Sequence, residues 1–469
     1  MAQPSLNLLA TSDNPDGAFP GRQPDIGDRS FFRSLQWSAD GTTLFTSSST
    51  NRICTFVLPE GLLEPRQEPV LLKAHGTLVL AEPTNAIAPC PYFALENPAT
   101  QVILTASSDH PIHLRHAFPQ PVTEDYPPSS PSSSSDGSQS PAPSTPTPRQ
   151  PPPIASFNLI KQETEAYLPV TALIWPSPGT HFIAGTTNRL AIYDVSRPES
   201  AMSSEPLLSI ATIPSTRHIS KGNGIGMRGT VAALAAQIRG EADHGLIAAG
   251  TWTRHMGLYD LQRAGECVAT WSVAGAATEA RVGGKGVVQT VWSPCGRYLV
   301  VNERASRGLL VYDVRGTYQL LACLTGRDGV DTNQRLSCDV FPGTESAGGF
   351  EVWAGTKDGS VAVWEGVGNQ AGAVEPSWKR RTHESAIGAA AIHSSGSVLA
   401  TCSGSWEFIE TNDSDSDSDS DSSDEGGSQL RNLKPPIVVQ ETSLKVWSIT
   451  SGTPPDANRS SMNEGGIEA

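Results

Sequence analysis

Residues 287–314 read VVQTVWSPCGRYLVVNERASRGLLVYDV, and this stretch decides the fold. One apolar strand ends in a W-S-P-x-G turn, a second apolar strand follows, and a third, alternating strand ends in an aromatic residue and an acid. Alternation with a period of two residues between glycine turns predicts short antiparallel strands. The same pattern recurs along the chain, which predicts a repeat protein built from strands.

Seven copies of this unit cover residues 34–59, 101–118, 170–195, 230–261, 287–314, 335–366 and 386–449. An aromatic residue near the end of the copies serves as a ruler, with Arg115 in its place in copy two: Phe56, Tyr193, Tyr259, Tyr312, Trp364 and Trp447. Such units bury both faces only by packing on each other, and closing a ring protects their edges. The sequence therefore predicts an all-β, seven-bladed WD40 β-propeller with disordered loop insertions. Two unrelated β-sandwiches would not repeat these motifs in register.

The predicted propeller occupies residues 28–450. We expect residues 1–27 to form a flexible N-terminal segment and residues 451–469 a disordered C-terminal tail. Two disordered inserts are expected, at about residues 119–153 between blades two and three, and at about residues 407–440 inside blade seven.

The two inserts differ in composition. Residues 119–153 contain 12 Pro and 9 Ser among 35 residues, too few apolar side chains to offset chain entropy. This insert is either a tolerated insertion, a polyproline ligand for SH3 or WW domains, or a phosphorylated loop. The stretch NDSDSDSDSDSSDE, Asn412 to Glu425, suits an acid-directed protein kinase, because an acid follows nearly every serine. It is either a passive solvated loop, a ligand for basic partners, or a screen between the propeller and RNA.

Bulk properties narrow the class of function. The formal net charge is −15, and nine of the acids lie between Glu407 and Glu425. The seven cysteines form no CxxC pair and are odd in number, which argues against a zinc site and a secreted disulfide framework. The N-terminus has no basic segment followed by an apolar run, and no stretch has the length of a membrane span, so we expect a soluble intracellular protein in the cytosol or nucleus, without a membrane partner.

Signatures of catalysis are absent from the sequence. It contains no P-loop, GxSxG, HExxH or EF-hand pattern, so we expect no enzyme, no cofactor and no metal. Three histidines are spaced three apart, but such positions on a strand face opposite sides, which disfavours a metal site: His110, His113 and His116. Three tryptophans share one position before the turn and are expected to pack in the core or between blades: Trp37, Trp175 and Trp292.

Four segments carry a family resemblance. They are FFRSLQWSADGTTLFTSSSTNRICTFVLP (31–59), DHPIHLRHAF (109–118), TNRLAIYDVSRP (187–198) and DTNQRLSCDVFPG (331–343). The first resembles blade one of the telomerase Cajal body protein family, WD40 proteins that bind RNA, and the second and third resemble two of its strand motifs. The fourth keeps the family's T-N-Q-R-[IL]-x-F-D-[LIV]-x-P almost intact and is the most specific. Arg115 and His116 replace the family's W-D.

The resemblance implies a nuclear protein that acts in RNA–protein complexes. Animal members of the family bind small Cajal-body RNAs, including telomerase RNA, and a budding-yeast relative is implicated in pre-mRNA splicing. We therefore expect a monomeric, non-catalytic nuclear scaffold that binds small nuclear or small Cajal-body RNA and RNP proteins. The alternative is a protein-only scaffold that binds peptides with the propeller faces.

The resemblance also implies candidate RNA-binding residues, which are Arg254, Arg304, Asn333, Gln334 and Arg335. Arginine suits phosphate and unstacked bases through bidentate bonding and stacking. Alternatively, Arg254 and Arg304 hold the ring together by pairing with blade acids such as Asp260 and Asp313. We expect Arg335 to be such a tie, between blades five and six, because polar clusters at strand starts more often satisfy backbone groups.

Overall fold

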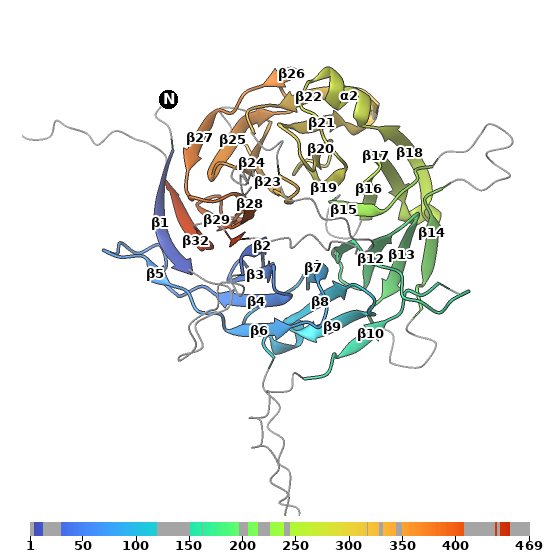
Figure 1. Cartoon of the computed structure of the whole chain (residues 1–469), viewed down its shortest axis with the longest axis horizontal. Helices are drawn as coiled ribbons and strands as arrows, with labels where there is room; N and C mark the ends of the chain where they lie inside the picture. The colour runs from blue at the N-terminus through green and yellow to red at the C-terminus, as the bar shows by residue number, and fades with distance from the viewer. Residues whose placement is uncertain are drawn as a thin grey trace, which may run out of the picture.

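A computed structural model of the chain places its strands in a closed ring of seven sheets around a central channel (Figure 1). The structure describes residues 4–12, 30–119, 151–161, 163–196, 205–213, 226–238, 244–316, 318–327, 332–343, 349–407, 437–438 and 441–450. Within this part of the chain, each of the seven sheets of the ring has four or five strands, and the strand nearest the channel comes first in its repeat. The prediction of an all-β, seven-bladed propeller is confirmed.

The blades follow one another in chain order, each from its innermost strand outward. Blades one and two are β2 (Phe32–Trp37), β3 (Thr43–Ser48), β4 (Arg52–Val57), β6 (Gly76–Val79), then β7 (Thr84–Pro89), β8 (Val102–Ser107), β9 (Ile112–His116), β10 (Ala155–Phe157). Blades three and four are β11 (Ala172–Ile174), β12 (His181–Thr186), β13 (Arg189–Asp194), β14 (Leu208–Ala211), then β15 (Val231–Ile238), β16 (His244–Thr251), β17 (His255–Asp260), β18 (Glu266–Ser272).

Blades five and seven each gain a fifth, parallel strand on the outside. Blades five and six are β19 (Val287–Trp292), β20 (Tyr298–Glu303), β21 (Leu309–Asp313), β22 (Leu320–Leu324), β26 (Gly372–Val374), then β23 (Cys338–Pro342), β24 (Phe350–Gly355), β25 (Ser360–Val367), β27 (Trp378–Arg381). Blade seven is β28 (Ile387–Ile392), β29 (Val398–Ser403), β32 (Leu444–Thr450), β1 (Ser5–Ser12), β5 (Val70–Leu71).

Ring closure corrects the prediction for the N-terminus. Residues 1–27 were expected to be a flexible segment, but β1 pairs antiparallel with β32 from Ser5↔Thr450 to Ser12↔Leu444. In Figure 1 the blue β1 lies beside the red β32. The first strand of the chain thereby completes the last blade, which stabilises the closed ring because neither end strand is left as a free edge.

The hydrophobic core lies between blades. Seven clusters of buried apolar residues each draw on two neighbouring sheets, so every blade boundary has its own core. The ruler aromatics all fall on the third strand of their blades, at equivalent partners such as Tyr312↔Leu299 and Trp447↔Leu399. Of the three tryptophans before turns, Trp37 and Trp292 donate from Nε1 across blade boundaries, to Ala391 O at 3.0 Å and Ala235 O at 3.2 Å.

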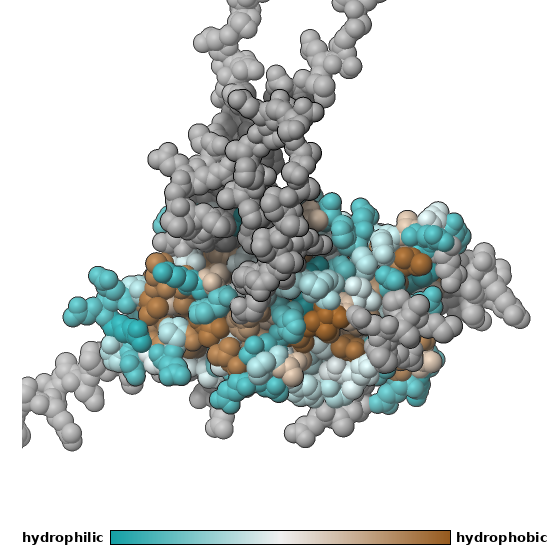
Figure 2. Space-filling model, turned by 90° about the horizontal axis from the view of Figure 1, so that it is seen from below, coloured by the Kyte–Doolittle hydropathy of each residue, from teal (hydrophilic) through white to brown (hydrophobic). Residues whose placement is uncertain are grey.

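The structure corrects the predicted position of the Pro/Ser insert and the predicted boundaries of the acidic insert. The Pro/Ser insert lies between β9 and β10, inside blade two instead of between blades two and three. Within the predicted insert 407–440, β30 (Trp406–Glu407) pairs with β31 (Ile437–Val438). The central parts of both inserts, including Asn412 to Glu425, and the tail 451–469 lie outside the described residues. Seen edge-on in Figure 2, the ring has small brown apolar patches separated by teal polar side chains.

Candidate nucleic-acid interface

The central channel forms a cavity of about 1660 Å³, lined mostly by the innermost strands of blades one to five and by residues 332–335. Small side chains of Ala, Ser and Thr predominate on these strands. Arginine is the one charged residue type among the described residues that line it, and it occurs three times: Arg33, Arg304 and Arg335. The channel is therefore cationic, although the whole chain is acidic.

The three arginines lie close enough to influence each other. Burial, followed by the charges of Arg304 and Arg33, lowers the pKa of Arg335 to about 10. Burial and then the charge of Arg304 also lower the pKa of Arg33. Within the described part of the chain, none of the three makes a hydrogen bond or ion pair to a carboxylate. Burying a cation without an anion is costly, so this cluster is suited to a bound anion.

The channel arginines share one face of the ring, which we call the top face, where the innermost strand of each blade begins. Antiparallel pairing brings the end of each second strand to the same face, as in Val287↔Glu303. Arg33 lies near the start of β2, where the register shifts between Phe32 and Ser34. Such a bulge re-aims a side chain, which accounts for the position of Arg33 in the channel.

Arg304 and Arg254 have different environments in the structure. Arg304 follows β20, lines the channel, and places its guanidinium carbon 5.9 Å from the ring centre of Trp252. Trp252 is 42% exposed at the top face. Arg254 instead forms a bidentate pair with Glu303 at 2.7 and 2.9 Å, and Glu303 has a side-chain exposure of only 2%. The partner of Arg254 is thus Glu303 of blade five, neither Asp260 nor Asp313.

The T-N-Q-R segment lies at the channel mouth. We expected Arg335 to tie blade five to blade six, but among the described residues it is Gln334 that bonds to another blade. Gln334 Nε2 donates to Gly404 O at 2.7 Å, which joins this segment to blade seven. Asn333 is exposed and Arg335 half-buried, and neither makes a side-chain hydrogen bond within the described residues. The structure brings Arg304, Asn333, Gln334 and Arg335 together on one cavity, while Arg254 lies outside its lining.

A residue that the sequence did not reveal, Arg327, joins blades five and six. It is completely buried and donates to Asn302 Oδ1 at 2.6 Å, to Gly355 O at 3.0 Å and to Leu336 O. Burial lowers its pKa to about 10. Because Leu336 directly follows Arg335, Arg327 holds the T-N-Q-R segment in place. No spacing or motif around Arg327 marks this role.

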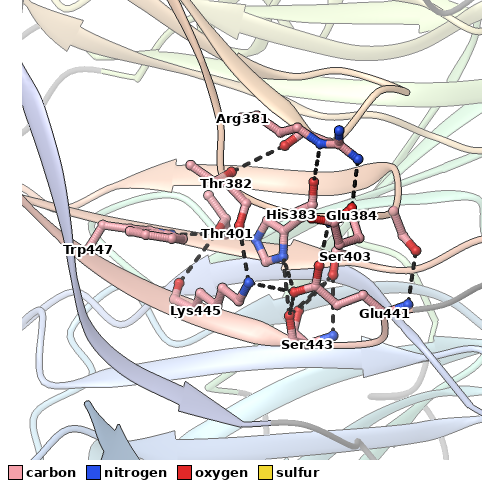
Figure 3. A network of polar contacts seen from close by, with 12 residues as sticks. Arg381, Thr382, His383, Glu384, Thr401, Ser403, Glu441, Ser443, Lys445 and Trp447 are labelled. Atoms are coloured by element: carbon pink, nitrogen blue, oxygen red, sulfur yellow. Dashed lines mark hydrogen bonds and ion pairs between the residues drawn. The ribbon is translucent and has the colours of Figure 1, made fainter. Parts of the chain in front are cut away.

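A second polar network lies inside blade seven (Figure 3). His383 Nδ1 lies 3.0 Å from Glu441 Oε1, and His383 Nε2 lies 2.7 Å from Thr401 Oγ1. Trp447 Nε1 donates to the same hydroxyl at 2.9 Å, and Lys445 Nζ is 2.6 Å from Glu441 Oε1. Burial lowers the pKa of His383, so the neutral imidazole donates from Nδ1 and accepts from Thr401.

Hydroxyl, imidazole and carboxylate in this order also occur in nucleophilic catalysis. Here the side chain of His383 has an exposure of 0%, and Thr401 is equally buried. A substrate therefore cannot reach the hydroxyl, and the network links the strands of blade seven. No motif in the sequence marks this network, because the acidic insert separates Thr401 from Glu441.

Two other kinds of site find no support in the described part of the chain. It contains no group of three or more His, Cys, Asp or Glu residues arranged to hold a metal ion. His113 Nδ1 instead lies 3.0 Å from Ser156 Oγ on the neighbouring strand. Among the same residues, no helix is long and apolar enough to cross a membrane.

The closed ring, the repeat register and the lined channel define a WD40-type β-propeller, a fold that generally serves as a scaffold. No family model matches the chain. The chain is 22% identical over 341 residues to the guanine nucleotide-binding protein negative regulator 1 of Schizosaccharomyces pombe, a match that covers 71% of this chain and 70% of that protein.

Proposed function

We propose that this propeller is a nuclear scaffold that binds small nuclear or small Cajal-body RNA, as the telomerase Cajal body proteins do, and that it uses the top mouth of its channel. The observation that carries the proposal is the cluster of Arg33, Arg304 and Arg335, which lack a carboxylate partner among the described residues. Phosphate supplies the missing anion, and arginine binds it through a planar, multiply donating group.

The surroundings of the cluster favour RNA over a simple anion. Trp252 is exposed next to Arg304, and single-stranded RNA is bound by stacking bases on aromatic rings and guanidinium planes. Asn333 adds an exposed amide, which can donate to and accept from a base edge. In this proposal Arg304, Asn333 and Arg335 contact RNA, Gln334 positions the segment, and Arg254 supports the ring.

The test is Arg335→Ala in the full chain, with RNA affinity and thermal unfolding measured on the same preparation. A fluorescein-labelled single-stranded RNA of about 16 nucleotides, the upper size of common single-strand sites, is the probe. We expect roughly tenfold weaker binding with an unchanged melting temperature, since Arg335 has no hydrogen-bond or ion-pair partner among the described residues that its removal would leave unpaired. Arg380→Ala, an exposed arginine on β27, is the matched control. Unchanged RNA affinity in Arg335→Ala would contradict the proposal.

Crosslinking and sequencing the RNA bound in cells tests the finer part of the proposal. Enrichment of small nuclear or small Cajal-body RNAs supports the assignment to RNP biogenesis, the telomerase RNP or splicing. The competing function is a protein-only scaffold, for which the name of the Schizosaccharomyces pombe relative points to G-protein regulation. Recovery of protein partners without enriched RNA would favour that function.

A further inference from the structure

A glycine-rich loop beside the channel mouth carries unpaired positive charge. After α2 (Ala274–Glu279), residues 281–286 read RVGGKG and lie at the boundary of blades four and five (Figure 1). Arg281 and Lys285 in this loop are exposed, as is Arg307 in the turn after β20. We call these three residues the outer track. Within the described part of the chain, none of them has an ion-pair partner.

The outer track has a fixed backbone. Lys285 N donates to Arg304 O at 2.8 Å, Arg304 N donates to Gly286 O at 2.9 Å, and Arg307 N donates to Val282 O at 2.8 Å. These bonds join the loop to the turn after β20, so the outer track and Arg304 belong to one small platform. The platform also contacts Trp252, because a Cβ added at Gly286, whose φ is 133°, would lie 2.8 Å from Trp252 O.

Nearby carboxylates do not cancel the charge of the platform. Glu303 is buried and engaged with Arg254, and Arg254 Nη2 also donates to Gly283 O at 3.4 Å. Glu279 is exposed at the end of α2 and is the remaining acid on this short connection. Among the described residues of this connection, Glu279 is one acid against two cations, and Arg307 adds a third positive charge, so the surface that continues outward from Arg304 is net positive.

We propose that an RNA strand bound at the channel mouth leaves it over blade five, with its phosphates on Arg281, Lys285 and Arg307. This inference rests on the proposed function and adds a path and a footprint to it. Arg304 is the junction, since it lines the channel and belongs to the platform. The channel mouth then accepts a short segment, and the outer track adds salt-sensitive contacts to its flank.

The test compares single-stranded RNAs of about 4 and about 16 nucleotides, which span the usual range of single-strand site sizes. We expect the wild-type chain to bind the longer RNA more tightly. The triple variant Arg281→Gln/Lys285→Gln/Arg307→Gln should bind the longer RNA at least about tenfold more weakly and the shorter RNA unchanged. Its salt dependence should lose about 0.7 per phosphate contact, or roughly 2 in the log–log slope.

A matched control removes the same charge elsewhere. Lys73, Lys161 and Arg380 are exposed at other parts of the ring, and Lys73→Gln/Lys161→Gln/Arg380→Gln should keep the wild-type preference for length. If both triple variants bind the longer RNA equally weakly, or if the outer-track variant binds it like the wild type, the path over blade five is overturned. The proposed channel site is not affected by either result. Failure of the wild-type chain to bind either RNA would overturn the path and the proposed function together. Circular dichroism verifies that each variant is folded.

Discussion

Arg254→Ala tests whether this arginine supports the ring or contacts RNA. The substitution removes both bonds to Glu303, at 2.7 and 2.9 Å, and leaves a carboxylate with 2% side-chain exposure without its partner. Breaking a buried pair on one side costs about 3–5 kcal/mol. Arg254 itself is 23% exposed, so water reaches part of the site after truncation, and we expect about 2–4 kcal/mol.

Urea unfolding followed by tryptophan fluorescence measures this loss of stability, and a double-mutant cycle assigns it to the pair of Arg254 and Glu303. Adding Glu303→Gln to Arg254→Ala removes the uncompensated charge at nearly constant shape. We expect the double variant to regain at least about 1 kcal/mol relative to Arg254→Ala. A single variant that loses less than about 1 kcal/mol, or a double variant that regains nothing, would refute the structural role. Normal stability with lost RNA affinity would instead make Arg254 a contact residue.

Four further outcomes follow from the structure. Thr401→Val removes the hydroxyl shared by His383 and Trp447, and urea unfolding should show a loss of about 2–4 kcal/mol, since two buried groups lose a partner. Burial lowers the pKa of His383, so the stability that its neutral imidazole contributes is lost as the pH falls below about 6.5, the ordinary pKa of histidine. In His383→Gln the urea midpoint should depend less on pH in that range. Burial raises the pKa of Asp339 to about 6, so the stability that its protonated carboxyl contributes is present below about pH 4 and is lost as the pH rises through 6. In Asp339→Asn the free energy of unfolding should no longer fall with pH over this range. Deleting residues 412–425 should leave the melting temperature within about 1 °C, because this segment has no apolar residue to bury, and a large loss would show that it packs on the ring.

The sequence predicted the closed ring but not the N-terminal strand that completes its last blade. Tyr193, Tyr259 and Tyr312 recur at one position because each must fill the same space between blades, so local patterns were sufficient there. Residues 5–12 read SLNLLATS and lack the repeat motif. Their partner strand β32 lies more than 400 residues away, and pairing at that separation depends on the whole ring.

The candidate site was predicted only in part, for a related reason. The family resemblance identified Arg335 and its neighbours through a shared motif, and Arg304 through its position between the middle strands of a blade. Arg33 lies in the segment that resembles blade one of the family, but nothing in that segment singles it out, and its place in the channel depends on a bulge at the start of β2. Arg327 depends on acceptors from two other strands, Asn302 and Gly355, which meet only after the blades have packed.

Mass spectrometric mapping of RNA crosslinks on the full chain tests the channel-mouth claim most directly. Ultraviolet crosslinking to a single-stranded RNA of about 16 nucleotides joins bases to the side chains on which they stack, and protease digestion locates those side chains. We expect crosslinked peptides that contain Trp252 and residues 332–335. Crosslinks confined to the outer strands of the blades or to the face opposite the top face would contradict this expectation.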